Sequence, residues 1–180
     1  MKLGEYNNDG YKRGAFLKVI FWLLSSRIFF ETFLPFPSAW KCFLLRIFGA
    51  SIGNGVVIKP HVKIKYPWLL KISNDVWIGE QVWIDNLGLV RIHDNVCISQ
   101  GAYILTGSHN YSKSSFDLIV KPVELKEGCW IGAKSIVCPG VVCNRLSVLT
   151  VGSVATSNLE DGSVYQGNPA KIRRKRPFES

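Results

Sequence analysis

The sequence from Ile72 to Ile104 reads ISNDVWIGEQVWIDNLGLVRIHDNVCISQGAYI, and isoleucine returns in it at every sixth position except for one longer step. This period fits neither the 3.6-residue repeat of a helix nor the alternation of a simple strand. It fits short strands joined by tight corners, each with one aliphatic side chain directed into a shared core. Three such units, here called hexads, would complete one turn of a triangular coil.

The same period continues in both directions from this stretch. It begins at Ile52 and, on a count that passes through Ile119, ends at Ala155. Insertions of two residues follow Ile64 and Ile84, and a longer one follows Ile104, so all three fall at one corner of the coil. The hexads are then expected to stack in three columns, formed by Ile52, Ile72, Ile92, Ile119, Val137 and Ala155, by Ile58, Ile78, Ile98, Leu125 and Cys143, and by Ile64, Ile84, Ile104, Ile131 and Leu149.

These features predict an all-β fold, a parallel β-helix over residues 51–160 with a functional loop at 105–118. An ordinary β-sandwich with some isoleucine periodicity is the alternative. A sandwich gives no reason for the phase to survive through so many hexads. The repeat itself does not determine the hand of the coil.

The two ends of the chain lie outside the repeat. Because the open end of a coil exposes unpaired backbone, residues 1–50 are expected to form a helical cap. Pro35 and Pro37 would separate its two helices, the second running from Ala39 to Phe48. Residues 161–180 are expected to form an irregular, basic C-terminal tail.

The formal net charge of +9 indicates an anionic ligand or an anionic surface. Much of this charge lies near the C-terminus, and a solvated tail is the alternative for that run. No recognised nucleic-acid motif accompanies the charge, so nucleic acid is not the expected partner. The basic run consists of Lys171, Arg173, Arg174, Lys175 and Arg176.

The segment from Ala15 to Leu34 is rich in aromatic and aliphatic residues, but Lys18, Arg27 and Glu31 interrupt it. It therefore falls short of the run of about 20 apolar residues that spans a membrane. A buried cap and a helix on a membrane surface both fit it.

The five cysteines form no C-x-x-C pair and are odd in number, which indicates reduced thiols in a cytoplasmic protein.

Several phrases resemble the hexapeptide-repeat acyltransferases. They are the hexads of the form I-G-x-x-V-x, the phrase IGAKSIVCPG (Ile131 to Gly140) and the phrase GNPAKI (Gly167 to Ile172). Within that family, three stretches resemble the colanic-acid type O-acetyltransferases of bacterial surface-polysaccharide gene clusters. These are FLLRIFGASIG (Phe43 to Gly53), KIKYPW (Lys63 to Trp68) and TGSHNY (Thr106 to Tyr111).

The resemblance implies a left-handed β-helix that assembles as a homotrimer, with active sites between neighbouring subunits. It implies acetyl-CoA as co-substrate, no metal, and a sugar hydroxyl of capsule, exopolysaccharide or O-antigen as acceptor. The acceptor would be a sugar or a lipid-linked oligosaccharide, reached in the cytoplasm or at the inner face of the cytoplasmic membrane.

The repeat also predicts an aromatic ridge, because one hexad position of the second column is aromatic on successive coils. The ridge would serve as a trimer contact or as a ligand platform, and it consists of Trp83, Tyr103 and Trp130.

The chain has three histidines, and one of them is the candidate general base. His61 lies in the middle of a hexad, where a solvated side chain is expected, and His93 follows a core residue, which indicates a structural role. His109 lies in the long insertion and in the TGSH phrase. A positioned imidazole can take the proton of a sugar hydroxyl during direct attack on a thioester. By resemblance, the backbone N–H of Ala133 would stabilise the resulting oxyanion.

The remaining site residues are assigned mainly by resemblance. Asn86 lies in the insertion one coil before His109 and is expected to contact the acceptor, with a turn-forming asparagine as the alternative. Tyr111, in the same phrase as His109, is also expected to bind the acceptor. For acetyl-CoA the expected contacts are Ala133, Val151 and Thr156 along the pantetheine and Lys171, Arg173 and Arg174 at the phosphates.

Three alternatives are open at this point. An N-acetyltransferase acting on an aminosugar or a nucleotide-aminosugar would use the same fold and cofactor. A metal-dependent hydratase of this fold would need three converging histidines, which the different hexad positions of His61, His93 and His109 disfavour. A non-catalytic β-helix scaffold would bind no acetyl-CoA.

Overall fold

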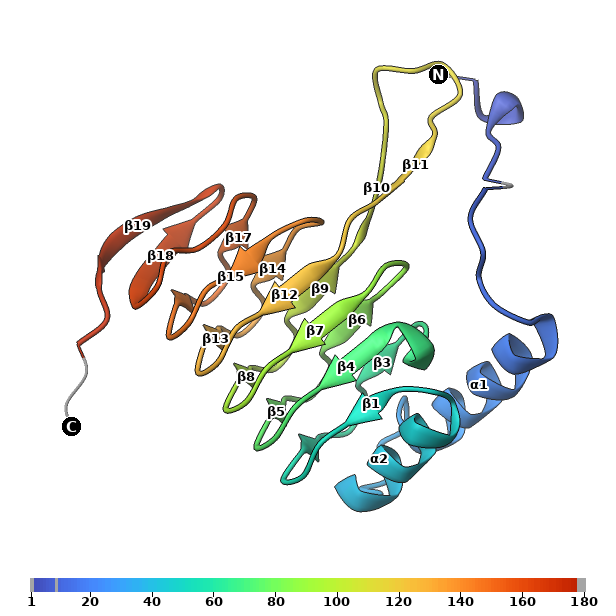
Figure 1. The fold of residues 1–180 in the computed structure, drawn as a ribbon, viewed down its shortest axis with the longest axis horizontal. Coiled ribbons are helices and arrows are strands. Elements are labelled where there is room, and N and C mark those ends of the chain that lie inside the picture. Colours follow the sequence, from blue (N-terminus) through green and yellow to red (C-terminus); the bar gives the residue numbers. More distant parts are fainter. Residues whose placement is uncertain (1, 9, 178–180) are drawn as a thin grey trace.

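The computed structural model describes residues 2–8 and 10–177 and shows a coil of short stacked strands (Figure 1). The strands that form the coil fall into three sheets, here called the first, second and third sheet, and all their pairings within the coil are parallel. The first sheet contains β1 (Ser51–Ile52), β4 (Leu70–Ile72), β7 (Val90–Ile92), β12 (Val123–Leu125) and β15 (Val142–Cys143).

The second and third sheets, like the first, are built from strands of successive turns of the coil. The second sheet contains β2 (Val57–Ile58), β5 (Trp77–Ile78), β8 (Cys97–Ile98), β13 (Trp130–Ile131), β16 (Val148–Leu149), β18 (Ser163–Gly167) and β19 (Ala170–Lys175). The third contains β3 (Lys63–Ile64), β6 (Trp83–Asp85), β9 (Tyr103–Leu105), β14 (Ile136–Val137) and β17 (Val154–Ala155).

The aliphatic residue of each hexad points into the core, as the period predicts. Ile78 pairs in register with Ile58 on one side and Ile98 on the other, and all three are buried. Burying such a side chain stabilises the fold by about 1.5–3 kcal/mol. The tight corners need backbone in the left-handed region, which Gln81 and Lys134 adopt with φ values of 59° and 54°. The parallel β-solenoid is therefore confirmed.

The predicted columns are wrong after the long insertion. Ile119 is not part of the coil, because it lies in β11 (Leu118–Val120), which pairs with β10 (Gly107–His109) outside the three sheets. Leu125 therefore stacks on Ile92 in the first sheet, and Ile131 stacks on Ile98 in the second. Every later hexad moves by one column: Cys143 belongs to the first sheet, Leu149 to the second, and Val137 and Ala155 to the third.

The predicted aromatic ridge is not a single ridge. Trp83 and Tyr103 are neighbours on the third sheet, with ring centroids 5.6 Å apart. Trp130 lies on the second sheet, beside Cys97. The three rings therefore occupy two different faces of the coil.

Two helices, α1 (Phe16–Phe29) and α2 (Ser38–Ile47), cover the N-terminal end of the coil (Figure 1). The Trp22 indole of α1 donates a 2.8 Å hydrogen bond to the carbonyl of Ile64. The buried Lys41 of α2 donates to the carbonyls of Ile58 and Lys59, at 3.2 and 3.0 Å. The first turn of the coil thus receives side-chain donors where it has no preceding turn. Short 3₁₀ turns, η1 (Leu3–Glu5) and η2 (Pro67–Leu69), complete the helical elements of the described residues.

The C-terminal segment is more regular than predicted. β18 pairs in parallel with β16 and so extends the coil, and β19 folds back antiparallel to β18. The Arg176 guanidinium is half-buried and donates to the carbonyls of Gly128 and Leu146, at 3.0 and 3.3 Å. A hairpin held onto the coil replaces the expected irregular tail, because its backbone can complete the edge of the second sheet.

Within residues 2–8 and 10–177, α1 and α2 are too short to cross a membrane, and no other helix there is long and apolar enough. This agrees with the prediction that the segment from Ala15 to Leu34 does not span one.

Candidate active site

The long insertion forms a two-stranded arm that projects from the coil after β9 (Figure 1). β10 and β11 pair antiparallel, with His109 opposite Leu118. The arm leaves the corner between the third and first sheets, here called the third-to-first corner. The sequence predicts this corner correctly, because the two shorter insertions lie there too.

The base of the arm is held by the first two residues of the TGSH phrase. Thr106 is buried, and its hydroxyl donates to the carbonyl of Asp85 and accepts from the N–H of Gly88, at 3.0 and 2.8 Å. A Cβ atom at Gly107 would lie 2.5 Å from the terminal Cδ1 atom of Leu87, so a larger residue there would have to displace this side chain. The Thr106 hydrogen bonds therefore hold the base of the arm against the coil, and Gly107 lets Leu87 pack closely beside it.

The His109 ring is oriented by the other strand of the arm. Its Nδ1 lies 2.9 Å from the carbonyl oxygen of Phe116, and the two rings stack with centroids 4.4 Å apart and planes within 2°. Because a carbonyl can only accept, Nδ1 must carry the proton of the neutral ring. Nε2 then presents a lone pair, which is the tautomer that a general base requires. Sequence reasoning could not identify this orienting partner.

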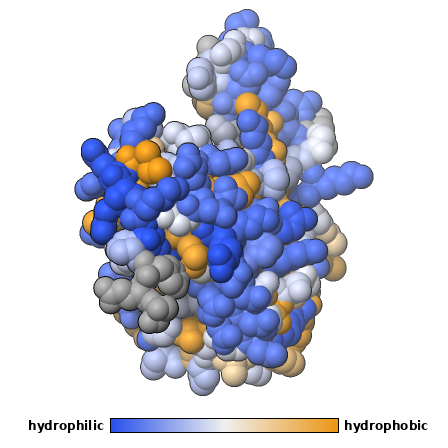
Figure 2. Space-filling view, turned by 60° about the vertical axis from the view of Figure 1, so that its left-hand side comes forward, coloured by the Kyte–Doolittle hydropathy of each residue, from blue (hydrophilic) through white to orange (hydrophobic). Residues whose placement is uncertain are grey.

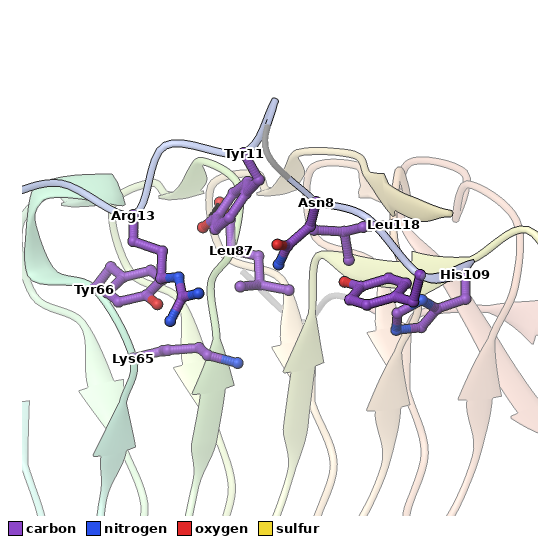
Figure 3. A pocket seen from close by; sticks show the side chains of 9 residues that line it. Asn8, Tyr11, Arg13, Lys65, Tyr66, Leu87, His109 and Leu118 are labelled. Atoms are coloured by element: carbon purple, nitrogen blue, oxygen red, sulfur yellow. Dashed lines mark hydrogen bonds between the residues drawn. The ribbon is translucent and has the colours of Figure 1, made fainter. Parts of the chain in front are cut away.

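A cavity of about 320 Å³ lies beside this ring (Figure 3). Its walls come from three segments that are distant in the sequence: the N-terminal segment, a corner of the coil, and the arm. The residues that line it are Tyr6, Asn8, Tyr11, Arg13, Lys65, Tyr66, Leu87, His109 and Leu118.

The N-terminal segment is fixed over this cavity by contacts at both ends. The Lys2 N–H donates to the carbonyl of Ser114 at the tip of the arm, at 2.8 Å. The Tyr11 hydroxyl donates to the carbonyl of Leu87, at 2.7 Å. Burial, and then the nearby Tyr66 and Asp85, raise the pKa of Tyr11 to about 12, so this phenol stays a donor near neutral pH. Sequence reasoning missed these wall residues because the segment has neither a periodic pattern nor a motif.

The two residues predicted to bind the acceptor lie differently from His109. Asn86 is 0% exposed; its amide oxygen accepts from the N–H groups of Lys65 and Tyr66, and its amide nitrogen donates to the carbonyl of Tyr66. This geometry favours the turn-forming alternative. Tyr111 is 88% exposed near the tip of the arm and does not line the cavity.

The predicted cofactor residues lie elsewhere on the coil. Ala133 and Val151 occupy the corner between the second and third sheets, whereas His109 and Thr156 belong to the third-to-first corner. One chain therefore does not bring His109 and Ala133 together. Among the described residues the Ala133 N–H has no hydrogen-bond acceptor, although other corner residues share this property.

Lys171, Arg173 and Arg174 are exposed on β19 at the C-terminal end of the coil. Figure 2 shows this end as a mainly hydrophilic surface. The sign and exposure of these side chains suit an anionic ligand.

The other histidines do not approach the arm. His61 lies at the corner between the second and third sheets with its ring centroid 4.1 Å from that of Phe33. The residue is half-buried and its Nε2 atom is buried, so its side chain is less solvated than expected. His93 lies at the corner between the first and second sheets, with Nε2 2.7 Å from a carboxylate oxygen of Glu124. In the part of the chain that the structure describes, no group of three or more His, Cys, Asp or Glu side chains is placed to hold a metal ion.

The cysteines do not offer a nucleophile. All five are free thiols, and three are buried in the core. Burial raises the pKa of Cys129 to about 12 and raises that of Cys143 well above its usual range. Because the thiolate is the reactive form, these side chains are inert packing groups.

A parallel β-solenoid of six-residue repeats is the fold of the hexapeptide-repeat acetyltransferases. The chain is 36% identical over 167 residues to a protein of Escherichia coli K12 described as a colanic acid biosynthesis acetyltransferase, WcaF, covering 93% of this chain and 92% of that one. No protein-family model matches. The chain therefore belongs to the hexapeptide-repeat acetyltransferases, in their colanic acid biosynthesis branch.

Solved structures show the same fold. A galactoside acetyltransferase in complex with coenzyme A superposes with a TM-score of 0.77 at 20% identity, covering 88% of this chain and 80% of that one. A hexapeptide-repeat acetyltransferase of Vibrio cholerae complexed with acetyl coenzyme A superposes with a TM-score of 0.73 at 21% identity, covering 79% and 80%.

The geometry of Asn86 generates a test of its role. Asn86→Ala would leave the Tyr66 N–H without a partner, whereas the Lys65 N–H keeps the carbonyl of Ile84 and the Tyr66 carbonyl keeps the N–H of Leu69. We therefore expect the free energy of unfolding to fall by about 1–3 kcal/mol. Urea unfolding followed by circular dichroism measures it. Gln100→Ala, at an exposed corner position, is the control and should change stability by less than about 0.5 kcal/mol. Unchanged stability with a raised acceptor KM would instead establish acceptor binding.

Proposed function

We propose that this acetyltransferase moves the acetyl group of acetyl-CoA directly to a sugar hydroxyl in bacterial surface-polysaccharide biosynthesis, with His109 as general base. The observation that carries the proposal is the Nδ1 contact with the Phe116 carbonyl, which leaves Nε2 as the basic atom of a ring that lines a cavity. The names of the relatives support the substrates, since they include a colanic acid biosynthesis acetyltransferase and a galactoside acetyltransferase solved with coenzyme A.

The reaction needs one base and one oxyanion donor. Nε2 of His109 takes the hydroxyl proton while the sugar oxygen attacks the thioester carbonyl carbon. The C–O bond forms, and the carbonyl oxygen becomes an oxyanion that the Ala133 N–H of a neighbouring chain would stabilise. When the C–S bond breaks, the departing thiolate takes the proton from the imidazolium. The products are an acetyl ester and free CoA, and His109 returns to its neutral form.

A homotrimer would complete this site. His109 and Ala133 occupy different corners of one chain, so the oxyanion donor for a given His109 must come from a neighbouring chain. A contact between one corner of a coil and a different corner of its neighbour, repeated three times around a threefold axis, closes the assembly. Light scattering should then give three times the 20.2 kDa mass of the chain. A catalytically active monomer would contradict this assignment.

The cofactor would lie between the arm and the C-terminal hairpin. Val151 and Thr156 are exposed, as residues that contact pantetheine must be, and the phosphates would meet Lys171, Arg173 and Arg174. Guanidinium and ammonium groups suit a ligand that carries several phosphate charges.

Peripheral association with the inner face of the cytoplasmic membrane fits helix α1. Trp22 and Phe30 are buried and cap the coil, as one of the two predicted alternatives requires. Leu17, Phe21 and Leu24 are exposed, however, with Phe21 at 59%. Capping therefore explains only one side of α1, and an apolar side with a nearby arginine, Arg27, is typical of interfacial helices.

Replacing the base tests the chemistry. His109→Ala should lower kcat by about 10²- to 10⁴-fold, because proton removal from the hydroxyl loses its acceptor, while the Kd for acetyl-CoA stays the same. Release of CoA with a sugar acceptor measures the first, and calorimetry measures the second. His93→Gln, which changes the histidine paired with Glu124, is the matched control and should keep normal turnover. Near-normal turnover of His109→Ala would contradict the assignment of His109 as the general base.

Neutralising the hairpin tests the cofactor site. In the double variant Lys171→Ala with Arg174→Ala, we expect the KM for acetyl-CoA to rise by about 5- to 100-fold, because two charge-assisted contacts to phosphate are lost. The fold should survive, since both side chains are exposed. Lys71→Ala with Arg91→Ala removes the same charge from the first sheet and should leave KM unchanged. An equal rise of the KM for acetyl-CoA in both double variants would mean that net charge rather than a specific site explains the effect.

Vesicle flotation tests the membrane proposal. Vesicles with anionic lipid should carry the protein at low salt and lose part of it at high salt, because the charge component is screened. Leu24→Asp should reduce flotation under both conditions by placing a carboxylate on the apolar side of α1. If the protein never floats with the vesicles, α1 serves only to cap the coil.

A further inference from the structure

A cavity of about 360 Å³, here called the third-sheet cavity, lies between the third sheet and the chain that joins α1 to α2. Among the described residues, it has no lining residue in common with the cavity beside His109. Three aromatic rings and three polar side chains form its walls. The rings are Phe33, Trp83 and Tyr103, and the polar residues are His61, Lys63 and Gln81.

Neighbouring strands of the third sheet form the floor of this cavity. Trp83 on β6 and Tyr103 on β9 pair in register, with ring centroids 5.6 Å apart and planes at 67°. The two side chains are 39% and 38% exposed, so part of each ring is open to solvent. The Lys63 ammonium of β3 lies 5.8 Å from the centroid of the Trp83 ring. The floor therefore offers an aromatic surface with a cation at its edge.

The rim of the third-sheet cavity contains a polar atom without a partner. Nε2 of His61 is buried and has no hydrogen-bond partner among the described residues. Phe33 packs against this ring edge to face, with centroids 4.1 Å apart, and is 88% exposed, so its side chain can turn aside. A hydroxyl that reached Nε2 in its place would supply the missing partner, because a hydroxyl both donates and accepts.

This combination of groups selects the chemistry of the ligand. A set of aromatic rings alone would suit a cation, but Lys63 repels one. A hydrocarbon would remove Lys63 and Gln81 from water without giving them partners, which is unfavourable. A sugar ring satisfies both parts, since its C–H face packs on an aromatic ring while the hydroxyls at its edge bond to polar side chains.

We propose that the third-sheet cavity is a carbohydrate-binding site, distinct from the acceptor site at His109. One sugar ring stacks on Trp83, and its hydroxyls bond to the polar rim. The site does not rest on the proposed function, because binding there needs neither acetyl-CoA nor a general base. It allows the protein to hold a glycan by a sugar other than the one that reacts.

Trp77, on the second sheet, is a matched control for Trp83. It is 44% exposed, and the Lys59 ammonium lies 4.8 Å from its ring centroid, so both tryptophans have a lysine above the ring. Its register neighbours are Val57 and Cys97, which supply no second ring. Trp77 should therefore not bind a sugar.

NMR signals of the indole N–H groups test the site. Trp83→Phe and Trp77→Phe assign two of the six signals, since each removes one. The protein without CoA is titrated with methyl glycosides of glucose, galactose and mannose, with glucuronate, and with sorbitol, which has hydroxyls but no ring. We expect at least one sugar to shift the Trp83 signal with a Kd of about 1–10 mM. The Trp77 signal and the sorbitol titration should show no shift.

Two variants identify the groups that bind the sugar. Tyr103→Ala removes the second ring of the floor, and Lys63→Ala removes a hydrogen-bond donor. Each should weaken the Kd measured at the Trp83 signal by about 3- to 10-fold. Lys59→Ala, which changes the lysine above Trp77, should leave this Kd unchanged. Circular dichroism checks that each variant is folded.

A further variant separates this site from the acceptor site. The separation is needed because another cavity, which contains Arg13, Lys65 and Trp83, lies between them. Leu118 lines the His109 cavity but not the third-sheet cavity, so Leu118→Trp should fill only the former. We expect this variant to lose turnover and to keep the Kd measured at the Trp83 signal.

Four outcomes would overturn the inference. A Trp83 signal that no sugar shifts would mean that the cavity binds none of them. An equal shift with sorbitol would mean a general effect of hydroxyl compounds. Loss of the shift in Leu118→Trp would make the cavity part of the acceptor site. Dissociation of the oligomer by Tyr103→Ala, seen in light scattering, would identify the ring pair as a subunit contact.

Discussion

A parallel coil has an end at which no preceding turn supplies backbone partners, and the rest of this structure depends on how that end is closed. Arg46 donates to the carbonyls of Ile52 and Gly53, at 3.0 and 2.8 Å, and completes the cover that Trp22 and Lys41 begin. Closing the end this way fixes α1 against the first turn. The chain that precedes α1 runs between this end and the tip of the arm, and that path takes Tyr6 and Tyr11 to the His109 cavity (Figure 1). One continuous N-terminal stretch therefore forms part of the cap and part of the wall of the acceptor pocket.

The sequence predicted the coil well because a period is a local property. Each hexad needs only one aliphatic side chain inward and a small one at the corner, and both requirements can be read without knowing the neighbours. Ile119 shows the limit of this reading, since it stands six residues before Leu125 and yet belongs to an antiparallel arm. Period alone cannot distinguish a strand of the coil from a strand that leaves it.

The site was less predictable, because its parts meet only through tertiary contacts. His109 could be found, since a long insertion at one corner of a rigid scaffold is a local signal. Its orienting carbonyl at Phe116 and the wall residue Arg13 carry no motif, and only the folded arm and the N-terminal segment bring them to the ring. Asn86 illustrates the opposite case: its position in the coil was predicted correctly, and its amide contacts with the backbone of the adjacent corner favour the turn-forming alternative. The hand of the coil was inferred from resemblance alone.

The two proposed substrate sites lie toward opposite ends of the coil. The acceptor cavity lies between the arm and the N-terminal segment that leads to α1, and the basic hairpin proposed for the CoA phosphates lies beyond the last turn (Figure 1). In a trimer, a threefold axis parallel to the coils would keep this order, because neighbouring chains then run in the same direction. Separate sites allow both substrates to be bound at once. Direct transfer requires both substrates to be bound together. The buried thiols favour direct transfer, because they are not suited to hold the acetyl group between two half-reactions. The arrangement of the ends thus argues for a ternary complex, in which His109 acts on both substrates within one cavity.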